Sequence, residues 1–110
     1  MTDFNISEFL VTNQLHEKTV NIRGKDHVVY IRRLPAVDVH KAVFEMQSDD
    51  SEVRKKAGFH EMARAFRDSA GGSTITFDQL CKSPTDVINV LRSTFFTFQS
   101  ESPSEDLGND

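Results

Sequence analysis

The chain has 110 residues, a length typical of one domain, and its single cysteine, Cys81, excludes an internal disulfide. Its formal net charge of −4 does not resemble the strongly basic composition of nucleic-acid-binding proteins. No apolar run approaches the length of a membrane span, and the acidic start Met1-Thr2-Asp3 does not resemble a secretory signal, so we expect a soluble protein of a reducing cytoplasm.

The negative charge is concentrated at the C-terminal end. Residues 100–110 hold four acids and no base, which leaves residues 1–99 electrically neutral. The same stretch is rich in Ser, Pro, Glu, Asp and Gly, a composition that cannot bury enough apolar surface to order itself. We therefore predict one domain over residues 1–99 and an acidic disordered tail over residues 100–110.

The N-terminal third predicts one β-hairpin over residues 19–33. Before it, a partly apolar segment contains Ser7, which we expect to cap a short helix. In Thr19–Arg23, alternate residues are apolar, which indicates a half-buried strand. Gly24 supplies the turn, and His27–Arg33 returns as a β-branched and aromatic run. Because a lone hairpin is marginal in water, it must pack on helices or on another copy.

The rest of the chain predicts helices. Pro35 precedes one over about 36–47, whose apolar residues recur at helical spacing, and a second is expected over 52–69, ending at Gly71-Gly72. A single turn follows at 78–80, and Ser83-Pro84 predicts the start of a last helix over 84–98. The fold class is α+β, mainly helical, with one small antiparallel hairpin near the N-terminus.

Aromatic residues provide the first candidate binding surface. Nine phenylalanines stand against one tyrosine, and phenylalanine has no polar group to keep it at a wet surface. Phe95, Phe96 and Phe98 are therefore candidates for partner binding or for self-association. The alternative is that they fill this domain's own core, and Cys81 is also expected to be buried.

Basic residues provide the second candidate surface. Arg23, Lys25, Arg32 and Arg33 could form one positive patch on the hairpin, able to meet an acidic partner, a phosphate or an acidic tail. The alternative is that they are ordinary solvated strand residues.

The chain shows no catalytic or metal-binding pattern. The four histidines are far apart, and His60-Glu61 is followed by Arg64 where a zinc-protease helix requires a second histidine. No serine lies in a Gly-x-Ser-x-Gly turn, and Gly71-Gly72-Ser73 lacks the lysine of a phosphate loop. We therefore expect no enzymatic activity, no metal and no cofactor.

The order of these segments resembles the tail assembly chaperones of long-tailed, lambda-like bacteriophages. The resemblance rests on the strand and turn Val20-Asn21-Ile22-Arg23-Gly24-Lys25 and on the returning strand Val29–Pro35. Helices, the Gly71-Gly72 loop, the turn with Phe77, Asp78 and Leu80, a closing helix and an acidic tail follow in the same order. The resemblance spans nearly the whole chain, although each motif is common by itself.

The resemblance implies a non-enzymatic, self-associating protein that binds the tape-measure protein and helps to recruit tail-tube subunits. It implies the host cell cytoplasm as its location and absence from the mature virion. A longer form produced by ribosomal frameshifting is common among such proteins. Two other functions stay open at this point: a small nucleic-acid-binding regulator that uses the hairpin, and a structural tail or head-completion subunit.

Overall fold

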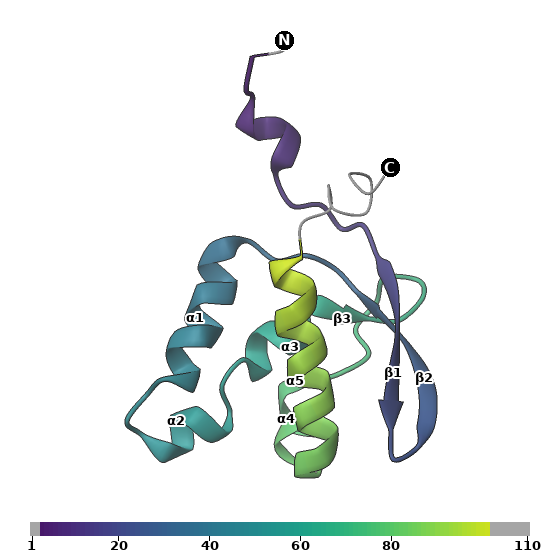
Figure 1. Cartoon of the computed structure of the whole chain (residues 1–110), viewed down its shortest axis with the longest axis vertical. Coiled ribbons are helices and arrows are strands. Elements are labelled where there is room, and N and C mark those ends of the chain that lie inside the picture. Colours follow the sequence, from purple (N-terminus) through teal and green to yellow (C-terminus); the bar gives the residue numbers. More distant parts are fainter. Residues whose placement is uncertain (1–2, 102–110) are drawn as a thin grey trace.

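A computed structural model describes residues 3–101, and the α+β prediction is confirmed. About half of the chain is helical, and three antiparallel strands form one sheet in the order β1-β2-β3 (Figure 1). The strands are β1 (His16–Ile22), β2 (Lys25–Ile31) and β3 (Phe66–Arg67). The helices are the 3₁₀ turn η1 (Ile6–Phe9) and the α-helices α1 (Ala36–Met46), α2 (Ser51–Lys55), α3 (Phe59–Ala65), α4 (Phe77–Cys81) and α5 (Thr85–Ser100).

The hairpin closes through a two-residue turn, and Lys25 and Asp26, which the sequence placed in the turn before His27, belong to β2. Ile22 pairs with Lys25, so only Arg23 and Gly24 form the loop. Both have positive φ, 55° and 81°, as a hairpin turn matched to the twist of its strands requires. Asn21 supports the turn because its Oδ1 accepts a hydrogen bond from the Gly24 N–H at 3.1 Å.

The predicted helix over residues 52–69 is wrong, because the chain breaks twice within it. Gly58 adopts a left-handed conformation (φ 79°), which separates α2 from α3. Helix α3 ends before Phe66, whose extended backbone pairs with Ile31 and forms β3. The helical spacing of Phe59, Met62 and Phe66 did predict burial, since all three side chains are in the core.

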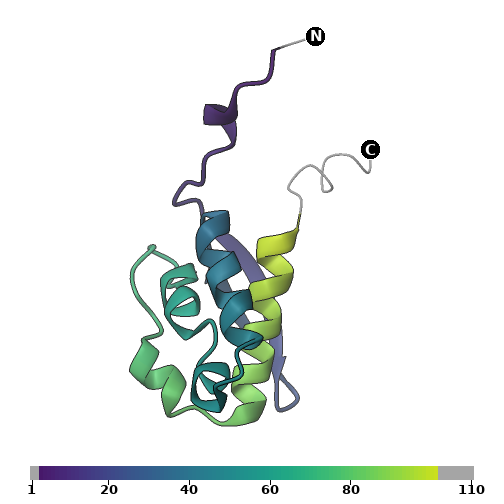
Figure 2. The ribbon, with the colours of Figure 1, turned by 90° about the vertical axis from the view of Figure 1, so that its left-hand side faces the viewer.

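Helix α5 supplies the largest share of the core. Ile88, Leu91, Phe95 and Phe98 are buried along one face, and the helix runs beside the hairpin (Figures 1 and 2). It ends at Ser100, two residues later than predicted. Gln99 ties that end to the segment after β2: its Oε1 accepts from the Leu34 N–H at 3.0 Å, and its Nε2 donates to the Arg32 carbonyl at 2.9 Å.

The two ends of the described chain lie at the same end of the molecule. In both views residues 3–11, here called the N-terminal arm, lead away from the body (Figures 1 and 2). The arm holds only η1, capped by Asn5, so the helix expected after Ser7 is wrong. The predicted disordered tail lies outside the described residues from 102 onward, while Ser100 still belongs to α5.

Candidate functional site

The basic residues of the hairpin do not form the single patch that the sequence predicted. Arg23 lies at the turn, where its Nε and Nη2 donate to the two carboxylate oxygens of Asp86 at 2.7 and 3.1 Å. These bonds hold the pKa of the Asp86 carboxyl below its usual value. Arg32 and Arg33 follow the far end of β2, which spans about 20 Å at the usual rise per residue. The hairpin therefore carries two separate groups of bases.

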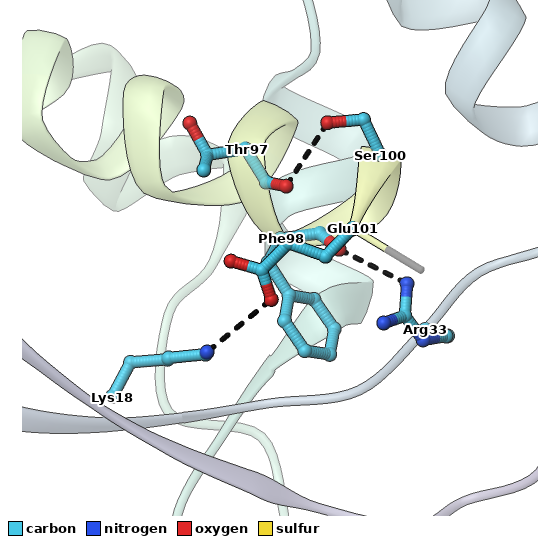
Figure 3. A network of polar contacts seen from close by, with 6 residues as sticks. All are labelled: Lys18, Arg33, Thr97, Phe98, Ser100 and Glu101. Atoms are coloured by element: carbon cyan, nitrogen blue, oxygen red, sulfur yellow. Dashed lines mark hydrogen bonds and ion pairs between the residues drawn. The ribbon is translucent and has the colours of Figure 1, made fainter. Parts of the chain in front are cut away.

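Arg32 and Arg33 fasten neighbouring parts of the chain. Arg33 Nη1 donates to the Phe98 carbonyl at 3.0 Å, and its guanidinium lies 4.5 Å from the centre of the Phe98 ring (Figure 3). Beside it, Lys18 forms an ion pair with Glu101 at 3.3 Å (Figure 3). Arg32 donates to the carbonyl of Arg64 and to Asn13 Oδ1, both at 2.9 Å. The contacts of Arg33 and Lys18 hold the C-terminal end of α5 against the hairpin, and those of Arg32 hold the chain at Asn13 and at the end of α3.

Two of the three candidate phenylalanines are inside the protomer. Phe95 and Phe98 are buried in the core, so they present no surface to a client or to a second copy. Phe96 is half-buried and packs edge to face against Phe95, with ring centres 5.1 Å apart. The alternative that these rings fill the domain's own core is therefore the correct one for Phe95 and Phe98.

The exposed rings lie elsewhere. Phe4 and Phe9 of the arm are 74% and 68% exposed, and Phe44 on α1 is 73% exposed. Val37, one helical repeat before Phe44, is 74% exposed, and Lys41 lies between them on the same face. We call Val37, Lys41 and Phe44 the outer stripe of α1. The sequence offered a signal, since the apolar residues of 36–47 are too many for one side of the helix.

A concave site lies between α2, the start of α3, α4 and α5. It is a pocket of about 340 Å³ whose apolar lining comes from Phe59, Leu80 and Ile88. Lys55, Lys56 and Arg92 are the charged residues at its edge, and no acidic side chain within residues 3–101 lines it. We call this the basic-edged pocket. Cys81 also lines it and is exposed, so its predicted burial is wrong; Leu80 takes the inward position of α4 instead.

Arg92 of α5 contacts both α2 and α3 at the basic-edged pocket. Its Nη2 donates to the Lys55 carbonyl at 3.2 Å, and its guanidinium lies 5.5 Å from the centre of the Phe59 ring. Burial lowers the pKa of Arg92, and its Nε is buried with no hydrogen-bond partner within the described chain. No part of the sequence indicated this pocket, because its lining comes from three segments that no motif links.

Comparison with protein-family models, with curated proteins and with solved structures found no match. Within residues 3–101, no three His, Cys, Asp or Glu side chains lie close enough together to hold a metal ion. None of the helices in that part of the chain is both long and apolar enough to cross a lipid bilayer.

Proposed function

We propose that this protein is a phage tail assembly chaperone, a non-enzymatic and self-associating helper that binds the tape-measure protein and helps to recruit tail-tube subunits. The observation that carries the proposal is the basic-edged pocket: an apolar floor with three bases at its edge suits an amphipathic helix. The order of segments along the chain supports the family.

The pocket suggests how a helical client would be held. A tape-measure helix exposes apolar stripes that aggregate before the tail tube encloses them. One large apolar side chain of such a helix would rest on Phe59, Leu80 and Ile88. Acidic residues on its flanks would meet Lys56, and would compete with Glu52, 3.0 Å away, for the ammonium group of Lys55. The chaperone thus acts by covering surface and changes no covalent bond.

The contacts of the hairpin disfavour the alternative of a nucleic-acid-binding regulator. Arg23 is committed to Asp86, and Arg33 is committed to the Phe98 carbonyl. Phosphate binding needs a concentrated positive field. We expect no retardation of duplex DNA at low salt. Mass spectrometry of purified virions tests the other alternative, a structural subunit, because a chaperone leaves the finished particle.

The direct test is co-purification with the tape-measure protein encoded by the same genome. Asn89→Trp places a bulky ring at the exposed wall of the pocket, and we expect it to weaken capture about tenfold or more. Thr19→Trp is the matched control, because Thr19 is exposed on β1, outside the pocket lining. Equal capture by wild type and Asn89→Trp would remove the pocket from the proposal, and no capture by wild type would remove the proposed client.

A further inference from the structure

The N-terminal arm is ordered by its own contacts. The rings of Phe4 and Phe9 stack with centres 5.6 Å apart and planes inclined by 15°. Asn5 Oδ1 accepts hydrogen bonds from the Ser7 N–H at 3.1 Å and from the Ser7 hydroxyl at 2.7 Å. The arm therefore presents a preformed apolar tip, and little further ordering is needed when it binds.

The arm is also directed away from the body. Arg32 Nη1 donates to Asn13 Oδ1 at 2.9 Å, and Thr12 Oγ1 accepts from the Gln14 N–H at 3.2 Å. These bonds fix the chain where the arm begins, and both views show it leading outward from that point (Figures 1 and 2). To lie on α1 of its own copy, the arm would have to reverse direction at residues 12–14, where these hydrogen bonds hold the chain.

The outer stripe of α1 has a complementary character. The acids of that helix are turned inward: Asp38 pairs with Arg64 at 3.2 Å, and Glu45 Oε1 accepts from the Gly58 N–H at 3.1 Å. The solvent side is left with Val37, Phe44 and the base Lys41, beside the exposed His40. It is a surface that is both apolar and basic.

We propose that the arm of one copy packs on the outer stripe of α1 in a second copy, with the exchange made in both directions. Charge supports the pairing, because the arm carries Asp3 and Glu8 and no base, whereas the stripe carries Lys41 and no acid. Reciprocal exchange gives an isologous dimer, in which the same two surfaces meet twice.

The available area fits a stable dimer. Phe4, Ile6, Phe9 and Leu10 are all more than half exposed. At about 100 Å² for each side chain, one arm offers about 400 Å² and the three residues of one outer stripe about 300 Å², so two of each bury on the order of 1,400 Å², within the range of a standard specific interface. The arm leaves these side chains exposed on its own protomer, so the area is free to be covered by a second copy.

This inference deepens the self-association in the proposed function and rests on it. The first test is sedimentation of full-length protein across about 1–100 µM, where standard interfaces of this size associate. We expect wild type to dimerise and Phe9→Ser and Phe44→Ser each to raise the dissociation constant about tenfold or more. Val28→Thr is the control, because Val28 is exposed on β2, away from both surfaces, and its variant should match wild type.

The second test exchanges charges between copies. Glu8→Lys and Lys41→Glu should each weaken dimerisation at low salt, because each places like charges against each other twice. Mixing the two variants should restore assembly. In the mixed dimer, the residue at position 8 of each arm faces a residue of opposite charge at position 41 of the other copy. If each arm lay on α1 of its own copy, mixing the variants would not restore the opposite-charge contact, and assembly would stay weak.

Each outcome separates the inference from the broader proposal. Rescue by mixing supports exchange between copies. Absence of rescue, or a dimer unaffected by Phe9→Ser and Phe44→Ser, overturns the arm exchange while self-association and client binding stand. A wild type that stays monomeric across the range overturns both the exchange and self-association, whereas capture of the tape-measure protein is measured independently at the basic-edged pocket.

Discussion

Glu61 is the residue whose environment departs most from what its chemistry prefers. Its side chain is only 3% exposed, and its Oε1 has no hydrogen-bond partner within the described residues. Burial first, and then the nearby Glu45, raises the pKa of the Glu61 carboxyl, while Lys41 and His60 act in the opposite direction. The fold therefore tolerates the neutral acid better than the carboxylate.

We predict that Glu61→Gln stabilises the protein at neutral pH, by about 1 kcal/mol, because it removes a buried charge without changing the shape of the side chain. The pKa of the Glu61 carboxyl is higher in the folded state than its ordinary value of 4.5, so between these two values the folded state binds more protons than the unfolded state. Wild-type stability therefore falls as the pH rises from the ordinary pKa to the raised one. Thermal unfolding at pH 4 and pH 7 checks this. An advantage that is as large at pH 4 as at pH 7 would contradict the electrostatic cause.

Phe98 shows why the sequence left open whether the last phenylalanines form a binding surface or fill the core. Its ring lies 5.0 Å from the His16 ring, centre to centre, and its centre lies 4.5 Å from the guanidinium of Arg33. The sequence showed a wide apolar face on the last helix but not that the hairpin and its basic end would cover it.

We predict that Phe98→Ala destabilises the protomer by about 3–5 kcal/mol, because it leaves a cavity in the core and removes the surface on which Arg33 lies. Phe44→Ala should change stability by less than about 0.5 kcal/mol, because that ring is exposed. Denaturant titration of the two variants at a concentration where the protein is monomeric makes the comparison. Similar losses for both would mean that the core does not depend on Phe98 as described.

At the scale of elements, the hairpin depends on its turn. Gly24 has φ 81°, and a Cβ added there would meet no atom within 4 Å, so the cost of a side chain is conformational and not steric. The neighbouring Arg23 already occupies the left-handed region and also holds Asp86 of α5. The turn thus couples the shape of the hairpin to the start of the last helix.

We predict that Gly24→Ala costs about 1 kcal/mol, because alanine is disfavoured at positive φ, and lowers the melting temperature by about 4–8 °C. Gly24→Asn should cost less, since asparagine tolerates the left-handed conformation. Circular dichroism melts of both variants check the order. If asparagine were as harmful as alanine, the loss would come from something other than backbone conformation.

Some elements could be predicted from the sequence because local patterns determine them. The alternation of Val20 and Ile22, the proline before α1 and the proline before α5 gave their elements to within about three residues. Strand β3 could not be found in this way, because two residues carry no period and the strand exists only through pairing with Tyr30 and Ile31. The break at Gly58 had a visible glycine, but helical spacing on both sides concealed it.

The candidate sites were harder for the same physical reason. The basic-edged pocket brings together residues from Lys55 to Arg92, and only the packed fold makes them neighbours. The arm was visible as an apolar stretch, yet its exposure depends on the direction that the Asn13–Arg32 contact gives it. Sequence patterns identified the apolar side chains but could not predict which of them would stay exposed outside the core.

At the scale of the whole molecule, the two proposed surfaces lie on different elements. The outer stripe belongs to α1, and the pocket is formed by α2, α3, α4 and α5. Assembly and client binding should therefore be separable by mutation.

We predict that Phe44→Ser raises the dissociation constant of the dimer about tenfold or more but leaves the capture of the tape-measure protein by each protomer within about threefold of wild type. Asn89→Trp should do the reverse, with capture weakened about tenfold or more and the dimer intact. Sedimentation and pull-down of the same preparations check both. Loss of both activities in either variant would show that the surfaces act as one.

The bond between Arg23 and Asp86 joins positions 63 residues apart, and β1 packs against α5. During synthesis the hairpin therefore emerges long before the helix that covers its inner face. Until residue 98 has left the ribosome, the apolar face of the hairpin cannot pack against α5. We expect nascent chains that end before α5 to be sensitive to protease, and folding to finish in one late step when the closing helix arrives.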